Sequence, residues 1–453
     1  MPQIVPEQWT GKSLFRLFWP LVVEQLLGVT MGIADTVMVT TIGEFAVSGV
    51  SIVDVINNLF IIAFGALATG GAVVVSQYIG RGDENHSASS SRQLVYVSAG
   101  AAVIATVIGV FLRRPILSLV YGAVEAEVAR AAETYFFISA LGYPFLALYN
   151  AAAALFRSMG NSRVPMLTAL LVNVLNIGGN ALLIFGFRMG VAGAALATLA
   201  SRGLAALILI VLLMRGRYRR SPVSLSGLFR LRIDLPIIKS ILYVGIPNGV
   251  ENSMFQVGKI MVARIFTSFG TAATAANAIA TAINSLSYMP GNAFGLGLLT
   301  VVGQCIGAGD NGAAKKYTAR IMKWGYLVLI VINGSVLLSM NGIVGIFGLS
   351  LQTAQLLKSY LWIHGIAAPI FWAPAFILPN ALRAAGDVRY CMIVSSITMW
   401  TIRITTAYIL AYSLGIGPAA AWYAMGADFV VRGLFFTARW TSGRWQGKKV
   451  IRE

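Results

Sequence analysis

The chain has 453 residues, of which 57% are apolar and 11% are charged, and its formal net charge is +18 at neutral pH. Soluble domains carry about 25% charged residues, so this composition excludes an ordinary soluble protein and predicts a polytopic membrane protein. The positive charge does not indicate a nucleic-acid partner, because most Lys and Arg residues fall in the termini and in alternate loops, on one side of the predicted spans.

Twelve membrane spans are predicted in chain order, so the expected fold is an all-α polytopic membrane protein. They cover residues 17–42, 46–79, 94–112, 134–156, 164–186, 191–214, 241–268, 274–306, 325–347, 357–382, 391–414 and 417–438. The second and eighth are longer than an untilted crossing of a hydrocarbon core about 30 Å thick requires, so they are expected to tilt or extend beyond it. The positive-inside rule places both termini in the cytoplasm.

The first span combines Pro20, Glu24 and Asp35 in one apolar stretch. A carboxylate near the centre of a membrane helix costs about 2.5–3.5 kcal/mol on insertion scales, so it indicates a partner or a functional site. Pro20 lacks a backbone N–H and is expected to kink the helix. A bendable helix with a buried titratable group favours ion-coupled transport.

An internal repeat relates the two halves of the chain. Pro20 and Glu24 recur as Pro247 and Glu251, and the same shift of 227 residues matches Gln-Tyr-Ile-Gly-Arg-Gly-Asp at 77–83 with Gln-Cys-Ile-Gly-Ala-Gly-Asp at 304–310. Six spans per half is an even number, which predicts two homologous six-helix bundles of the same orientation. The expected domains are an N-terminal lobe at 1–214, a basic cytoplasmic linker at 215–240 and a C-terminal lobe at 241–453. The Gly-x-Gly-Asp loops are interpreted as helix ends rather than phosphate-binding motifs.

Several motifs together resemble the MATE (multidrug and toxic compound extrusion) family of the MOP flippase superfamily. They are Pro20 with Asp-Thr-Val-Met at 35–38, the paired Gly-x-Gly-Asp loops, Phe-Arg-Ser-Met-Gly-Asn at 156–161, and Asn176 and Asn180 before Leu-Leu-Ile-Phe-Gly at 182–186. The resemblance implies a V-shaped twelve-helix fold and antiport of H⁺ or Na⁺ against organic cations and drugs.

The resemblance also implies an ion-coupling site in the N-terminal lobe. Its carboxylate falls on Asp35, its amides on Asn150 and Asn176, its hydroxyl on Thr198, and its kinking proline on Pro20. This chain has Asn180 where many relatives have Asp, which removes a negative charge and a proton site. The alternative for Asp35 is a structural hydrogen-bond role, and for Asn176 and Asn180 it is contacts between helices. Thr198 could instead bond to its own helix.

Residues 176 and 180 lie one helical turn apart and face the same way. Their amide oxygens, with Asp35 and Thr198, suit a hard cation such as Na⁺, or the amides could govern when Asp35 releases a proton. The loss of the second acid favours H⁺. No other metal site and no cofactor is predicted.

Further candidates for gating or the substrate path are Glu24, Glu251, Asp54, Lys259 and Tyr149. The acids, with Asp428, could instead be hydrated residues near the interface. The basic side chains in the spans could extend to the membrane rim; these are Lys259, Arg264, Arg403, Arg202 and Arg432.

The expected function is therefore a monomeric secondary-active multidrug exporter of the inner membrane, which contacts small organic substrates and the bilayer but no nucleic acid. A lipid-linked-sugar flippase of the same superfamily is the alternative, for which Lys259 and Arg403 are the only signs of a cationic cavity. An integral membrane enzyme is disfavoured, because the sequence has no paired Asp-rich motif and no Cys/His cluster.

Overall fold

The computed structural model describes residues 9–122, 124–215, 223–448 and 450–451, and over these residues it contains helices and turns but no strand. The predicted all-α fold is confirmed. Two compact units follow one another in the chain, the first ending at Gly249 and the second beginning at Val250, within the long helix α9 (Leu235–Ser268). Residues 216–222 of the predicted linker lie outside the described residues.

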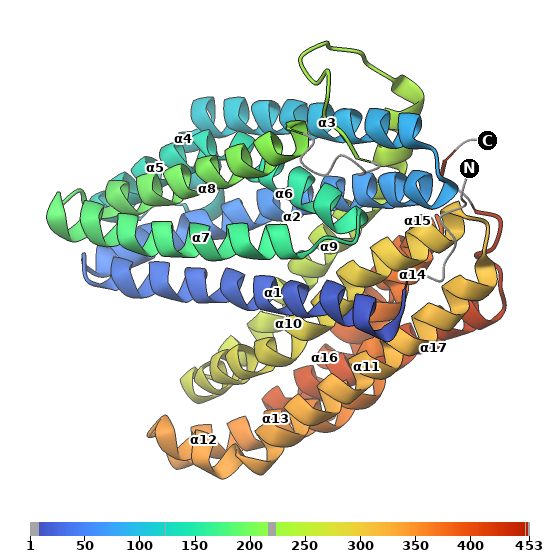
Figure 1. Cartoon of the computed structure of the whole chain (residues 1–453). Helices are drawn as coiled ribbons and strands as arrows, with labels where there is room; N and C mark the ends of the chain where they lie inside the picture. The colour runs from blue at the N-terminus through green and yellow to red at the C-terminus, as the bar shows by residue number, and fades with distance from the viewer. Residues whose placement is uncertain (1–8, 123, 216–222, 449, 452–453) are drawn as a thin grey trace. The chain divides into compact units, whose positions relative to one another are not determined.

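The first unit is a bundle in which α2 packs against α3, α5 and α6, and α7 packs against α1 and α8 (Figure 1). Its helices are α1 (Gly11–Thr40), α2 (Glu44–Arg81), α3 (Glu84–Phe111), α4 (Arg113–Tyr121), α5 (Ala126–Leu141), α6 (Tyr143–Ser158), α7 (Arg163–Asn180), the π-helical turn η2 (Ala181–Gly186) and α8 (Gly190–Met214).

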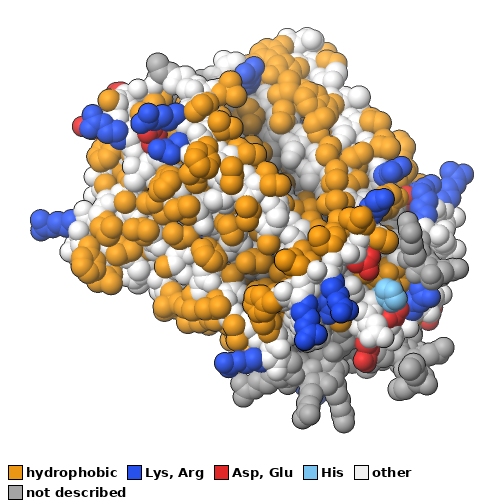
Figure 2. All heavy atoms as spheres, turned by 90° about the horizontal axis from the view of Figure 1, so that it is seen from above, with side chains coloured by type: hydrophobic (Ala, Val, Ile, Leu, Met, Phe, Trp, Pro, Cys, Tyr) orange, Lys and Arg blue, Asp and Glu red, His pale blue; other side chains and the backbone are white. Residues whose placement is uncertain are grey.

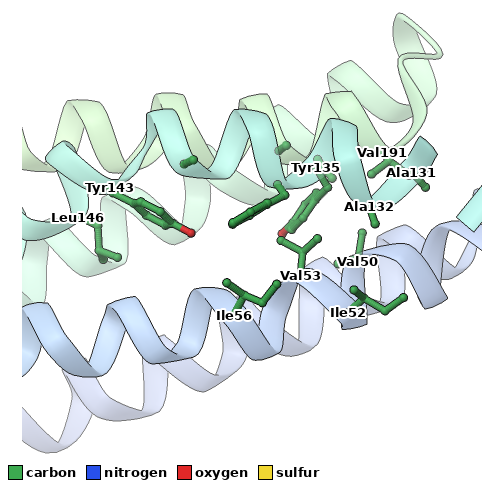
Figure 3. Close-up of a cluster of buried hydrophobic side chains, with 14 of the residues drawn as sticks. Val50, Ile52, Val53, Ile56, Ala131, Ala132, Tyr135, Tyr143, Leu146 and Val191 are labelled. Carbon is green, nitrogen blue, oxygen red and sulfur yellow. The ribbon is translucent and has the colours of Figure 1, made fainter. Parts of the chain in front are cut away.

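The core of this unit fills the space between α2 and the helices that cover it. Figure 3 shows Tyr135 of α5 and Tyr143 of α6 above Val53 and Ile56 of α2. All four side chains are buried. Burial of such aliphatic and aromatic side chains fixes the position of α2, on which Asp54 lies.

The second unit begins with the part of α9 after Gly249. It continues with α10 (Thr271–Gly307), α11 (Asn311–Leu338), α12 (Met340–Ile346), α13 (Leu351–Trp372), η3 (Ala373–Ile377), α14 (Leu378–Ala384), α15 (Val388–Ile397), η4 (Thr398–Ile404), α16 (Thr405–Tyr408), η5 (Ile409–Ser413), η6 (Gly417–Ala419) and α17 (Ala420–Thr441). Within it, α10 packs against α11, α13 and α14, and α13 packs against α17.

Each of the twelve predicted spans falls on helix. Among the described residues, nine helices are long and apolar enough to cross a membrane, and the bent pair α5–α6 makes a tenth. The other two predicted spans lie on α9 and α17, which carry ionisable residues such as Glu251 and Asp428. The face in Figure 2 is covered mainly by apolar side chains, with charged side chains gathered in separate patches, as a membrane-embedded surface requires.

The fourth span differs from its prediction as one continuous helix. It breaks at Gly142, and α5 and α6 meet there at 45°. Pro144, in the first turn of α6, has no N–H with which to continue the hydrogen-bond ladder of α5. Tyr143, the first residue after the break, is buried in the core that α5 and α6 form with α2.

The two Gly-x-Gly-Asp loops are confirmed as helix ends. Gly82 ends α2 with a φ of 78°, and the Asp83 carboxylate accepts a hydrogen bond from the N–H of the first turn of α3. In the second unit Gly309 has a φ of 79°, and Asp310 accepts from the Ala313 N–H at the start of α11. Glycine ends one helix and aspartate begins the next, so each pair is joined without a linker.

Candidate ion-coupling site

Three asparagines on one face of α7 connect this helix to α1 and α8. Asn180 Nδ2 donates to Asp35 Oδ1 of α1 at 2.5 Å and also lies 3.4 Å from Asn176 Oδ1. Asn176 Nδ2 donates to Thr198 Oγ1 of α8 at 3.0 Å. Asn173, one turn earlier, donates to the main-chain oxygen of Leu27 in α1 at 2.8 Å.

This network is largely shielded from water. Asn176 and Asn180 are fully buried, and Asp35 and Thr198 are half-buried. The Oδ1 atom of Asn180 is buried without a hydrogen-bond partner. One carboxylate, two amides and a hydroxyl are therefore held together, with one acceptor still available for a donor or a cation. The π-helical turn η2 follows Asn180 directly, and such turns are frequent at functional sites.

A second carboxylate and a guanidinium lie close to Asp35. Asp54 of α2 is exposed and hydrogen-bonds Asn57, whose Oδ1 accepts from Tyr143 Oη at 2.9 Å. Arg202 of α8 interacts electrostatically with both Asp35 and Asp54. The sequence-based interpretation of Arg202 as a rim residue did not include these two carboxylates.

Two predicted members of the site stand apart from this network. No hydrogen bond between described residues joins Asn150 of α6 to Asp35, so its role in ion coupling stays a prediction. Pro20 is buried in α1, and the helix continues through it from Gly11 to Thr40. Pro20 still removes one backbone hydrogen bond from the ladder.

Glu24 and Glu251 each form a buried ion pair. Glu24 Oε1 accepts from Arg157 Nη1 at 2.8 Å, and Tyr149 interacts electrostatically with this pair. Glu251 is held through both carboxylate oxygens by Arg383 Nη2, at 2.7 Å each. Each glutamate is less than a tenth exposed and paired with an arginine, and the interpretation of both as near-interface residues stays a prediction.

The second unit also corrects three interpretations made from the sequence. Asp428 is fully buried rather than hydrated at the interface, and it lies 3.3 Å from Arg432 and 3.7 Å from Arg403. Both arginines are buried instead of extending to the rim. Lys259 is exposed on α9, with its Nζ over the ring of Phe255.

Sequence reasoning missed Asn173, Arg157, Arg383 and the two cationic partners of Asp428. The arginine–glutamate pairs had a signal in the sequence. Arg-Ser-Met-Gly-Asn-Ser-Arg at 157–163 matches Arg-Ala-Ala-Gly-Asp-Val-Arg at 383–389 at a shift of 226 residues, and the two glutamates recur at the repeat spacing. Asn173 shares the helical face of Asn176 and Asn180. Among the described residues, no three His, Cys, Asp or Glu side chains gather as a metal site.

The two repeated helical bundles form a polytopic membrane fold, and the first bundle contains the carboxylate–amide network described above. The MatE family model matches residues 20–182 and again residues 247–409, which together make up most of the chain. The chain belongs to the MatE family, which is a transporter family and not an enzyme family. The two matches begin 227 residues apart (247 against 20), the same spacing as the internal repeat.

Relatives along the whole length support this assignment. The "Probable multidrug resistance protein NorM" of Thermotoga maritima is 28% identical over 99% of this chain and 95% of the relative. The "Uncharacterized transporter YisQ" of Bacillus subtilis is 28% identical over 96% of this chain and 94% of the relative. A solved structure described as MATE in the bent conformation has the same fold, with a TM-score of 0.87, 18% identity and 96% coverage of both chains.

Proposed function

We propose that this MatE-family transporter exports organic cations and amphiphilic drugs by antiport, and that protons drive export by binding at Asp35. Family membership and relatives named as multidrug resistance proteins support multidrug export. The observation that carries the coupling site is the hydrogen bond from Asn180 Nδ2 to Asp35 Oδ1 within the shielded α1–α7–α8 network.

The asparagine can serve both charge states of the carboxyl group. A carboxylate accepts hydrogen bonds only, and Asn180 supplies a donor to it. A protonated carboxyl group gains an O–H donor, and the Oδ1 atom of the same amide is buried without a partner. Proton binding would therefore add a hydrogen bond from the carboxyl O–H to Asn180 Oδ1, which has no partner while Asp35 is ionised.

The charges around Asp35 favour a proton over Na⁺. Na⁺ sites gain affinity from negative ligands, but position 180 is a neutral amide and Arg202 already places a positive charge near Asp35 and Asp54. A Na⁺ ion also needs several oxygen ligands around one point, whereas a proton needs only one oxygen of the carboxylate.

Protonation would act on α1, because two asparagines of α7 hold the later part of this helix. Asn173 bonds a main-chain oxygen of α1, which no proton alters, whereas Asn180 bonds the side chain of Asp35. Neutralising Asp35 changes one of the two contacts, and the backbone gap at Pro20 lowers the cost of bending the helix between states. We expect the resulting movement of α1 to couple proton entry to substrate release by alternating access.

The proposal also includes the membrane location, the topology and the oligomeric state of the protein. The distribution of basic loops supports the inner membrane with both termini in the cytoplasm. One chain contains both repeats, so a monomer suffices. A lipid-linked-sugar flippase is the second candidate, and it is favoured by a specific observation, the excess of basic side chains around Asp428 in the second unit.

Ethidium efflux activity, measured as ethidium uptake into inverted vesicles, tests the proposal under imposed proton or sodium gradients. We expect efflux with a proton gradient alone, and loss of gradient-driven efflux in Asp35→Asn at wild-type protein levels. Efflux driven only by sodium would contradict proton coupling. Full efflux by Asp35→Asn would contradict the site, and Asp54→Asn then tests the neighbouring carboxylate.

A further inference from the structure

Three cationic side chains of the second unit surround one aromatic ring. The centroid of Phe255 on α9 lies 5.2 Å from the guanidinium carbon of Arg403, 5.5 Å from that of Arg432 and 5.9 Å from Lys259 Nζ. Among the described residues, Asp428 is the one carboxylate that contacts these arginines. These five residues are called the basic–aromatic cluster below.

The cluster carries more positive than negative charge. Three cations face one carboxylate, so its formal charge is two positive units in excess. The other ionisable groups that interact with Arg403 are His364 of α13 and Tyr288 of α10, and neither is anionic at neutral pH. Like charges in a region of low dielectric repel strongly, so the cluster gains stability from an added anion.

Part of its hydrogen-bonding capacity is unused, although Arg432 Nη2 donates to the main-chain oxygen of Ser395 at 3.2 Å. The contacts of Asp428 with Arg432 and Arg403, at 3.3 and 3.7 Å, exceed the 2.7–2.9 Å typical of a charge-assisted hydrogen bond. Arg403 Nη1 and Arg432 Nε are buried without a hydrogen-bond partner. These donors, with the ammonium group of the exposed Lys259, suit a ligand that bears anionic oxygens.

Aromatic side chains extend from the cluster. Phe376 of η3 lies under Arg432 and stacks on Trp372, which stacks in turn on Tyr288. Phe429 of α17 lies 5.9 Å from Arg403. Trp372 and Phe429 are buried, whereas the partly exposed rings of Phe376 and Tyr288 would contact the apolar body of an organic anion. Arg403 and Phe376 both lie on π-helical turns, which are frequent at functional sites.

We propose that the basic–aromatic cluster is a substrate subsite that binds the anionic group (sulfonate, carboxylate or phosphate) of an amphiphilic molecule. Lys259, at the exposed end, makes the first contact, and Arg403 and Arg432 bind the anionic oxygens while the rings contact the apolar part. This inference adds anionic and zwitterionic amphiphiles to the substrate class of the proposed export function. Binding itself does not depend on ion coupling at Asp35.

Equilibrium binding of radiolabelled taurocholate, an amphiphilic sulfonate, to the full-length protein in nanodiscs of neutral lipid tests the subsite. We expect saturable binding that weakens about tenfold in Lys259→Gln, as the loss of a charged contact implies. The matched control is Arg264→Gln, which removes an exposed positive charge from the same helix outside the cluster and should leave binding unchanged. No saturable binding in the wild type, or equal losses in both variants, would overturn the subsite.

Arg403 tests the buried part of the cluster. Arg403→Gln should weaken taurocholate binding at least tenfold, and Arg403→Lys, which keeps the charge, should recover part of it. A thermal unfolding midpoint measured on each variant separates lost binding from misfolding. Weakening that follows the unfolding midpoint rather than the charge would assign the arginine a structural role and overturn its part in the subsite.

A second arm separates two sources of the same anionic chemistry. Displacement of taurocholate by dodecyl phosphate, but not by phosphatidate in the nanodisc, would identify the ligand as a soluble amphiphile. Displacement by phosphatidate would identify it as a lipid phosphate. Displacement by neither would overturn the subsite. Ethidium efflux measured in parallel keeps the inferences separate, because its failure would contradict the proposed antiport while taurocholate binding still reports on the cluster.

Discussion

Each unit contains a buried Glu–Arg ion pair, but the other charged clusters of the two units differ in the sign of their net charge. In each, a glutamate four residues after the helix proline binds an arginine on a helix about 130 residues further on, through Glu24–Arg157 and Glu251–Arg383. Beyond these pairs the first unit places two carboxylates, Asp35 and Asp54, around one arginine. The second unit places three cations around one carboxylate.

The repeat position of Asp35 is Val262, which is buried and apolar. The shared features are therefore the ion pairs and the glycine–aspartate helix ends, which determine how each bundle is built. The features that differ are buried polar clusters, each of which costs free energy to keep in a membrane unless it has a function. We therefore propose that the retained features serve the architecture of each bundle and that the changed features serve transport.

The largest expected effect tests the shared ion pairs. Arg383→Ala leaves Glu251 buried without its partner and should cost about 3–5 kcal/mol, lowering the thermal unfolding midpoint of the purified protein. Arg157→Ala should cost less, because Arg157 contacts one oxygen of Glu24 and its side chain is more exposed (14% against 9%). A larger loss in Arg157→Ala would show that the pairs do different work in the two units.

The next prediction sharpens the contrast in charge. Asn180→Asp places a second carboxylate within hydrogen-bond distance of Asp35. Two negative charges at this distance repel, so we expect proton-driven ethidium efflux to fall about tenfold and to become stimulated by sodium. Asn180→Ala is the control, since it removes the donor without adding charge; sodium stimulation of that variant would contradict the electrostatic explanation.

A smaller effect tests whether the helix ends are equivalent. Gly82→Ala and Gly309→Ala each force a side chain into a left-handed backbone, which costs about 1–2 kcal/mol, and neither added Cβ meets another atom within 4 Å. We expect equal decreases in unfolding midpoint. Gly334→Ala, inside α11 and also without a neighbour within 4 Å, should not destabilise the protein. Unequal losses at residues 82 and 309 would contradict the shared role.

The smallest effect concerns the outer member of the coupling network. Thr198→Val removes the acceptor of Asn176 Nδ2, which should cost about 0.5–1.5 kcal/mol and lower proton-driven efflux severalfold. Thr198→Ser keeps the hydroxyl group and should retain most of the activity. Equal activity of the valine and serine variants would separate Thr198 from coupling.

The sequence predicted most of the fold, because apolar runs mark the membrane helices and the repeated spacing marks the two bundles, and both can be read directly from the order of residues. It also brought Asp35, Asn176, Asn180 and Thr198 into one candidate site, and the structure connects these four side chains by hydrogen bonds. Arg432, a partner of Asp428, lies four residues later on the same helix, and its spacing was a signal in the sequence, whereas the partner Arg403 was not predictable in this way. A buried carboxylate and a hydrated one look alike in a sequence, and only tertiary packing brings Arg403 to Asp428.

The attachment of α1 has a mechanical consequence. Its first half is anchored through Leu14, Leu17 and Leu21, all fully buried, whereas its second half exposes Ile33 and Val37 by about 60% each. The second half is held by the hydrogen bonds from Asn173 and Asn180, and Asp35 lies in this more exposed half. A small change of angle near Leu21 becomes a displacement of several ångströms at Asp35, because about 20 Å of helix lie between these residues at a rise of about 1.5 Å per residue. The hydrogen bond from Asn180 to Asp35 can thus control a large movement of the second half of α1.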